Sequence, residues 1–123
     1  MRNFRDLKVW VKAHELTLAV YSGTRAFPRD ELYGLTSQMR RSCISIEANL
    51  AKGCGRNSAG EMGRFVLIAM GSASELECHL LLARDLGFVT QDEHARLQDR
   101  LTEVRRMLFA LSRTIRSGLP TKS

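Results

Sequence analysis

Apolar side chains recur along most of this chain at intervals of three and four residues, which is the period of an amphipathic α-helix. The repeat is most regular between residues 91 and 117, where apolar positions follow alternating steps of four and three residues. A seam with this spacing is expected where helices pack nearly parallel or antiparallel to one another. The last third of the chain is therefore predicted to be one helix of a bundle. Its seam consists of Leu97, Leu101, Val104, Leu108, Leu111 and Ile115.

Helical spacing also runs through residues 6–24, which carry two apolar stripes rather than one. Two stripes cover more of a helix than a lone bundle requires. Part of this surface is therefore expected to face another subunit. The first stripe contains Leu7, Trp10, His14, Thr17 and Tyr21, and the second contains Val9, Ala13, Leu16 and Val20.

Two middle helices follow from the same periodicity. The earlier one is expected to begin between residues 31 and 36 and to end at Gly53, and the later one to run from residue 59 to about residue 85. Small residues between positions 69 and 74 permit close approach of a neighbouring helix. The expected faces are Leu35, Met39, Ser42, Ile46 and Asn49 on the earlier helix, and Phe65, Ala69, Ser72, Leu76 and Ala83, with Val66, Met70 and Ala73 beside them, on the later one.

Local signals mark the connections between these segments. Pro28 disfavours helical geometry at the residue before it, and Gly87 is placed where the third helix should stop. Ser58 and Thr90 are each followed three residues later by a glutamate, which predicts a capping box at the start of the third and of the fourth helix.

Length and composition fit a single domain of this kind. The 123 residues, 44% of them apolar, are sufficient for one core and too few for two. We predict an all-α fold, an antiparallel up-down-up-down four-helix bundle over residues 1–117, followed by a flexible tail at residues 118–123. No stretch has the apolar length of a secretory signal or a membrane span, so a cytoplasmic location without a membrane is expected. Three cysteines without Cys-x-x-Cys spacing, Cys43, Cys54 and Cys78, are interpreted as reduced thiols.

Charge suggests a class of partner. The chain has 19 basic and 13 acidic residues, a net charge of +6 and a pI near 9.8. The charge is polarised, since residues 61–90 carry two basic and four acidic groups. A polyanionic partner is therefore plausible. The basic segment at residues 105–123 has no acid and contains Arg105, Arg106, Arg113, Arg116 and Lys122.

Helical geometry arranges the cations in two stripes. Arg106 and Arg113 project nearly opposite the seam of the last helix, and Arg105 and Arg116 flank them. A second stripe consists of Arg41, Lys52 and Arg56. Both stripes are candidate nucleic-acid-binding sites, because they would neutralise phosphates without reading sequence. The alternative is that each is an ordinary solvated helix face.

The residues that usually carry chemistry form no recognisable catalytic site. His14, His79 and His94 lie on three different predicted helices without a carboxylate or second histidine at metal-ligand spacing, and we interpret them as partly exposed structural residues. Glu75 and Glu77 point about 200° apart around a helix, so they cannot act as a paired acid and base. We expect a protein that is not an enzyme and that uses neither metal nor cofactor.

Asn49 is the one polar residue on the predicted core face that invites a specific role. A polar group at such a position is costly without hydrogen-bond partners. The favoured interpretation is a buried hydrogen bond that fixes helix ends or register, and the alternative is contact with a ligand.

Several segments, in order, resemble the four-helix-bundle proteins encoded within 23S ribosomal RNA intervening sequences. The resemblance covers roughly residues 4–117 and departs from the family pattern at Leu50 and Lys52, where isoleucine and glutamate are usual. Lys52 makes the second helix more basic than is typical. The matching segments are FRDLKVW at 4–10, FPRDELYGLTSQMRR at 27–41, SIEANLAKG at 45–53 and FVLIAMGSASEL at 65–76.

This resemblance implies a subunit that assembles into a ring-like homopentamer with a basic surface for nucleic acid, expected to be RNA and associated with ribosomal RNA. A related branch serves as the accessory protein of diversity-generating retroelements and binds RNA and a reverse transcriptase. The alternative function is therefore an oligomeric adaptor for a protein partner such as a reverse transcriptase, with no direct nucleic-acid role.

Overall fold

A computed structural model describes residues 2–118 of the chain, and within that range it is helical without any β-strand. Two short 3₁₀ turns, η1 (Phe4–Asp6) and η2 (Arg29–Glu31), accompany the helices. The prediction of an all-helical chain with four helices is confirmed. The helices are α1 (Lys8–Thr24), α2 (Leu35–Cys54), α3 (Ala59–Asp85) and α4 (Gln91–Ser117).

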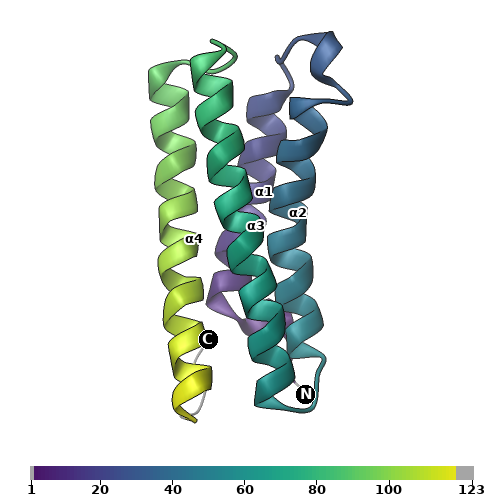
Figure 1. Cartoon of the computed structure of the whole chain (residues 1–123), viewed down its shortest axis with the longest axis vertical. Helices are drawn as coiled ribbons and strands as arrows, with labels where there is room; N and C mark the ends of the chain where they lie inside the picture. The colour runs from purple at the N-terminus through teal and green to yellow at the C-terminus, as the bar shows by residue number, and fades with distance from the viewer. Residues whose placement is uncertain (1, 119–123) are drawn as a thin grey trace.

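The helices run alternately up and down and lie side by side in one bundle (Figure 1). Each helix packs against the helices next to it in sequence, and α4 closes the bundle against α1. The α2–α3 interface is the most extensive. The α2–α3 connection, the start of α1 and the end of α4 consequently meet at one end of the bundle (Figure 1).

Side chains stabilise the starts of the two longest helices. At the start of α4 the Thr90 hydroxyl accepts from the Glu93 amide at 3.1 Å, and the Glu93 carboxylate accepts from the Thr90 amide at 2.8 Å, so the predicted capping box is complete. At the start of α3 the Ser58 hydroxyl accepts from the Glu61 amide. No return bond from the Glu61 carboxylate accompanies it among the described residues, so only half of that predicted box forms.

The predicted seam of α4 lies in the core, since all six of its apolar residues are buried. The predicted face of α2 is buried as well, from Leu35 through Asn49. Burial of one leucine side chain is worth roughly 1.5–3 kcal/mol, so a charge at Leu101 or Leu108, both fully buried, would remove this contribution and add the cost of burying an unpaired ion.

The two apolar stripes of α1 differ in burial, since Val9, Ala13, Leu16 and Val20 are buried, whereas Trp10, His14 and Tyr21 of the other stripe are only partly buried. The stripe from Leu7 to Tyr21 lies against α2, where Thr17 donates a hydrogen bond to the Cys43 carbonyl at 3.4 Å. The Arg40 guanidinium lies 4.6 Å from the centre of the Tyr21 ring. The expectation that part of this surface faces another subunit stays a prediction.

By length and composition, α3 is apolar enough to cross a membrane, with a mean hydropathy of 1.5 in its most apolar window. This criterion is weak evidence for a membrane, since the core helix of a bundle also meets it. Here α3 packs between α2 and α4.

Candidate nucleic-acid interface

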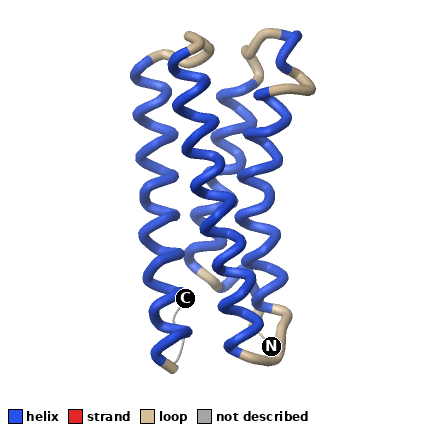
Figure 2. Tube along the Cα trace, in the orientation of Figure 1, coloured by secondary structure: helices blue, strands red, loops and turns tan. Residues whose placement is uncertain are grey.

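The end of the bundle that carries the α2–α3 connection is built from three separate stretches, residues 2–8, 51–64 and 109–118 (Figure 2). The Arg2 amide donates a hydrogen bond to the Cys54 carbonyl at 3.1 Å, which ties the N-terminal stretch to the end of α2. The antiparallel packing of α3 on α4 brings the third stretch beside the second. We call this region the basic end.

The positive charge of the protein is concentrated there. The three stretches contain eight basic side chains and two acidic ones, Asp6 and Glu61. The other described residues carry ten basic and eleven acidic side chains, and Lys122 lies outside the described range. The net charge of +6 is therefore accounted for by one end of the bundle. Its basic residues are Arg2, Arg5, Lys8, Lys52, Arg56, Arg64, Arg113 and Arg116.

Three of these arginines form a continuous group. The guanidinium groups of Arg56 and Arg64 lie 5.0 and 5.5 Å from the centre of the Phe65 ring. Arg64 and Arg116 line the same groove between the start of α3 and the end of α4. Within residues 2–118, no carboxylate lies within salt-bridge distance of Arg56, Arg64 or Arg116.

All seven basic residues predicted to bind nucleic acid are exposed, as expected. The two stripes, however, lie on α2 and α4, which are not in contact in the bundle. Their C-terminal members, Lys52, Arg56, Arg113 and Arg116, belong to the basic end. Arg41, Arg105 and Arg106 lie earlier in their helices and outside this end.

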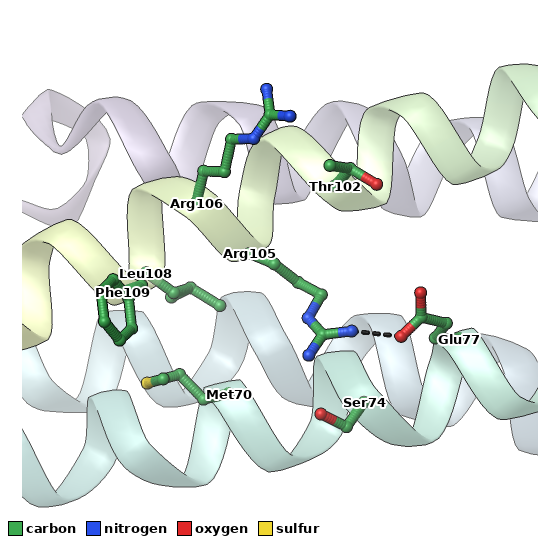
Figure 3. A pocket seen from close by; sticks show the side chains of 8 residues that line it. All are labelled: Met70, Ser74, Glu77, Thr102, Arg105, Arg106, Leu108 and Phe109. Atoms are coloured by element: carbon green, nitrogen blue, oxygen red, sulfur yellow. Dashed lines mark hydrogen bonds and ion pairs between the residues drawn. The ribbon is translucent and has the colours of Figure 1, made fainter.

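Arg105 is engaged within the subunit. Its guanidinium forms an ion pair with Glu77 of α3, across a 430 Å³ pocket whose apolar lining includes Met70 and Phe109 (Figure 3). Gln98 donates a second hydrogen bond to the Glu77 carboxylate at 2.9 Å. Arg106 extends from α4 away from this ion pair (Figure 3). A phosphate at Arg105 would have to compete with Glu77.

Arg64 is a residue of the basic end that the sequence pattern did not single out. It lies within residues 61–90, where acidic side chains outnumber basic ones, so the charge pattern along the sequence did not indicate a basic site there. Topology would have revealed it, because in an up-down-up-down bundle the start of the third helix lies beside the ends of the second and fourth.

A purely structural explanation exists for part of the basic end. Lys52 and Arg116 occupy the last turns of α2 and α4, where a cation interacts favourably with the helix dipole by about 0.3–1 kcal/mol. This explanation does not extend to Arg64 in the second turn of α3, or to Arg56 in the connection.

The histidines differ from their predicted description in two respects. His14 and His79 each have a carboxylate partner, with Nδ1 of His14 2.9 Å from Glu47 and Nε2 of His79 3.2 Å from Glu75. His94 is buried rather than partly exposed. Within residues 2–118, no group of three or more His, Cys, Asp or Glu side chains is placed to hold a metal ion.

Asn49 is buried, with 8% of its surface exposed. Its Nδ2 donates to the Ser45 carbonyl at 2.8 Å and to the Ser45 hydroxyl at 3.1 Å. That hydroxyl lies 2.8 Å from the Ser72 hydroxyl of α3. Asn49 is therefore buried and hydrogen-bonded, but within α2, and the link from α2 to α3 near the middle of both helices is the Ser45–Ser72 contact.

Comparison with known proteins agrees with this fold. A crystal structure of a protein of unknown function from the S23 ribosomal protein family of Bacteroides thetaiotaomicron superposes with a TM-score of 0.77 at 22% identity, covering 86% of this chain and 99% of that one. No curated protein matches the sequence. The family of 23S rRNA-intervening sequence proteins matches residues 5–110. With four helices in the expected order and this match over most of its length, the chain belongs to the 23S rRNA-intervening sequence protein family.

Proposed function

We propose that this protein is a non-enzymatic, cytoplasmic assembly protein that binds RNA through the basic end of its bundle. The observation that supports the proposal is the charge of that end, which carries eight basic and two acidic side chains, whereas the other described residues are nearly neutral in sum. Cations brought together on one surface attract the phosphate backbone and release its counterions, which gives affinity without sequence reading. Association with ribosomal RNA is the corresponding proposal for its biological target, by analogy with the family.

Affinity is proposed to come from repetition of this surface in a homo-oligomer, with a ring-like pentamer as the specific expectation. The outer face of α3 supports assembly, because it carries a second seam of exposed, uncharged residues with steps of four and three. A seam of this spacing fits packing against another helix. We call it the outer seam, and it consists of Leu67, Gly71, Ser74, Cys78 and Leu81.

Two details favour a helix from another subunit at the outer seam. A Cβ added at Gly71 would meet no atom within 4 Å, so a glycine that lowers helix propensity has no packing reason inside the subunit. Leu67 is 59% exposed. In a symmetric assembly the basic ends would recur once per subunit, and weak contacts would add through multivalency where one RNA spans neighbouring copies.

A charge-matched pair of variants tests the basic end. In the first, Lys52, Arg56, Arg64 and Arg116 are replaced together by glutamine. In the second, four exposed arginines outside the basic end are replaced by glutamine, so that the net charge changes equally. The control set is Arg25, Arg29, Arg96 and Arg100.

Binding to single-stranded RNA is measured by fluorescence anisotropy at several salt concentrations. The basic-end variant should bind RNA more weakly. The slope of its log K against log salt concentration should become shallower by about 0.7 for each phosphate contact that is lost. The control variant should stay close to the parent. Equal losses in both variants would show that only net charge matters, and no salt dependence in the parent would favour the adaptor alternative, with a protein partner such as a reverse transcriptase.

A further inference from the structure

A groove of about 330 Å³ opens at the basic end between the start of α3 and the end of α4. Its α3 side is formed by Ala59, Gly60 and Gly63, whose lack of larger side chains leaves the space open. A Cβ at Gly60 would meet no atom within 4 Å, whereas one at Gly63 would lie 3.3 Å from Ile115 of α4. The volume lies at the lower limit of small-molecule sites in proteins, which hold a ligand on an apolar floor with a few polar groups.

Ser112 of α4 supplies a polar group to this groove without a partner of its own. The residue is 95% buried, since 5% of its surface is exposed, and it lines the groove. Within the described part of the chain its hydroxyl makes no hydrogen bond, unlike the hydroxyls of Ser42 and Thr114, which bond to carbonyls of their own helices. The Ser112 hydroxyl is not one of the fully buried unpaired polar atoms of residues 2–118, so it is open to the groove and available to donate to a ligand there.

The charges around the groove favour an anionic partner. Arg64 lines it from α3 and Arg116 from α4, and neither has a carboxylate within salt-bridge distance among residues 2–118. The N-terminus of the 27-residue helix α3 is adjacent, and its free amides and dipole favour negative charge. The remaining lining, Leu67 and Ile115, is apolar.

We propose that this groove binds one nucleotide unit of the RNA, with its phosphate between Arg64 and Arg116, a phosphate oxygen accepting from the Ser112 hydroxyl, and its sugar on the glycine-lined floor. The proposal rests on the RNA-binding function proposed above and assigns to it a specific contact. A guanidinium pair recognises phosphate by charge-assisted hydrogen bonds, whereas the floor accepts the less polar part of the nucleotide.

Gly60→Leu tests the groove without removing any charge. Leucine has a higher helix propensity than glycine and its side chain would enter open space, so the variant should fold while the groove is filled. Ala110→Leu is the matched control, because Ala110 is exposed near the end of α4 and does not line the groove. Ser112→Ala is a second variant that removes only the unpaired hydroxyl.

In the full-length protein, Gly60→Leu should weaken binding to single-stranded RNA about tenfold, the effect of one charge-assisted contact, and Ala110→Leu should not. Adenosine monophosphate, followed by NMR, should shift the amides of Gly60, Gly63 and Ser112 in the parent, whereas adenosine should not. If the parent binds RNA with the expected salt dependence but Gly60→Leu binds equally well, or if the nucleotide shifts none of these amides, the groove assignment is wrong and the proposed function is unaffected. Absence of RNA binding by the parent would instead remove the proposed function.

Discussion

The hydroxyl of Ser45 lies 2.8 Å from the hydroxyl of Ser72, and this contact joins α2 and α3 inside their interface. Asn49 extends the network by donating to the Ser45 hydroxyl and carbonyl, and Ser72 donates to the Ile68 carbonyl at 3.2 Å. The Ser45–Ser72 contact is the part of this network that crosses between the helices, so it favours one relative height of α2 and α3.

Asn49→Leu should destabilise the protein, because it removes two hydrogen bonds and forces a bulkier apolar group into a packed interface. The expected loss in the free energy of unfolding is about 1–3 kcal/mol, measured by urea denaturation. Asn57→Leu, at an exposed position in the α2–α3 connection, serves as the control and should change stability by about 0.5 kcal/mol or less. Equal stability of Asn49→Leu and the parent would contradict a structural role for this network.

The capping box of α4 predicts a pH dependence. Backbone and side-chain hydrogen bonds from Thr90 lower the pKa of the Glu93 carboxyl. A lowered folded-state pKa means that the contribution to stability is present above the unfolded-state pKa and is lost as pH falls through the folded-state value. The stability difference between the parent and Glu93→Gln should therefore be largest at neutral pH and shrink in acid. Urea denaturation across the acidic range measures it, and a difference independent of pH would count against the box.

Much of the fold could be predicted from short-range patterns. The six-residue seam of α4 and the Thr90 cap depend on spacings of three and four residues, which the helix itself fixes. The contact between His14 and Glu47 joins residues 33 positions apart on different helices, so no local pattern contains it.

The candidate site was predicted in part for the same reason. Lys52 and Arg116 were identified by periodicity along single helices, but their common location with Arg64 depends on antiparallel topology. Ser112 carries no sequence signal, since a serine at that position normally bonds to its own helix. Its unpaired hydroxyl can be recognised only when the surrounding atoms are placed.

Cys43 provides a second pH-dependent prediction, at alkaline pH. Burial raises the pKa of its thiol from 9.0 to about 11. The unfolded chain then ionises before the folded one, so stability should fall as pH rises from about 9 to 11. A shift of this size corresponds to about 3 kcal/mol, and Cys43→Ala should lack that part of the decline. Comparing the slopes of unfolding free energy against pH tests this, and parallel slopes would contradict it.

The outer seam of α3 carries the last prediction. Gly71→Glu should dissociate the assembly, because each copy would place an unpaired charge where two helices are proposed to approach closely. Light scattering should give a lower mass for Gly71→Glu than for the parent, with the helical circular dichroism of both unchanged. Ala95→Glu adds the same charge at an exposed position of α4 and should leave the mass unaltered. Cys78, which is exposed in the isolated subunit, supplies an independent readout, since alkylation should be slow in the assembled parent and fast in Gly71→Glu. A parent of monomeric mass whose Cys78 reacts at once would remove the outer seam as an interface and, with it, the contribution of multivalency to RNA affinity.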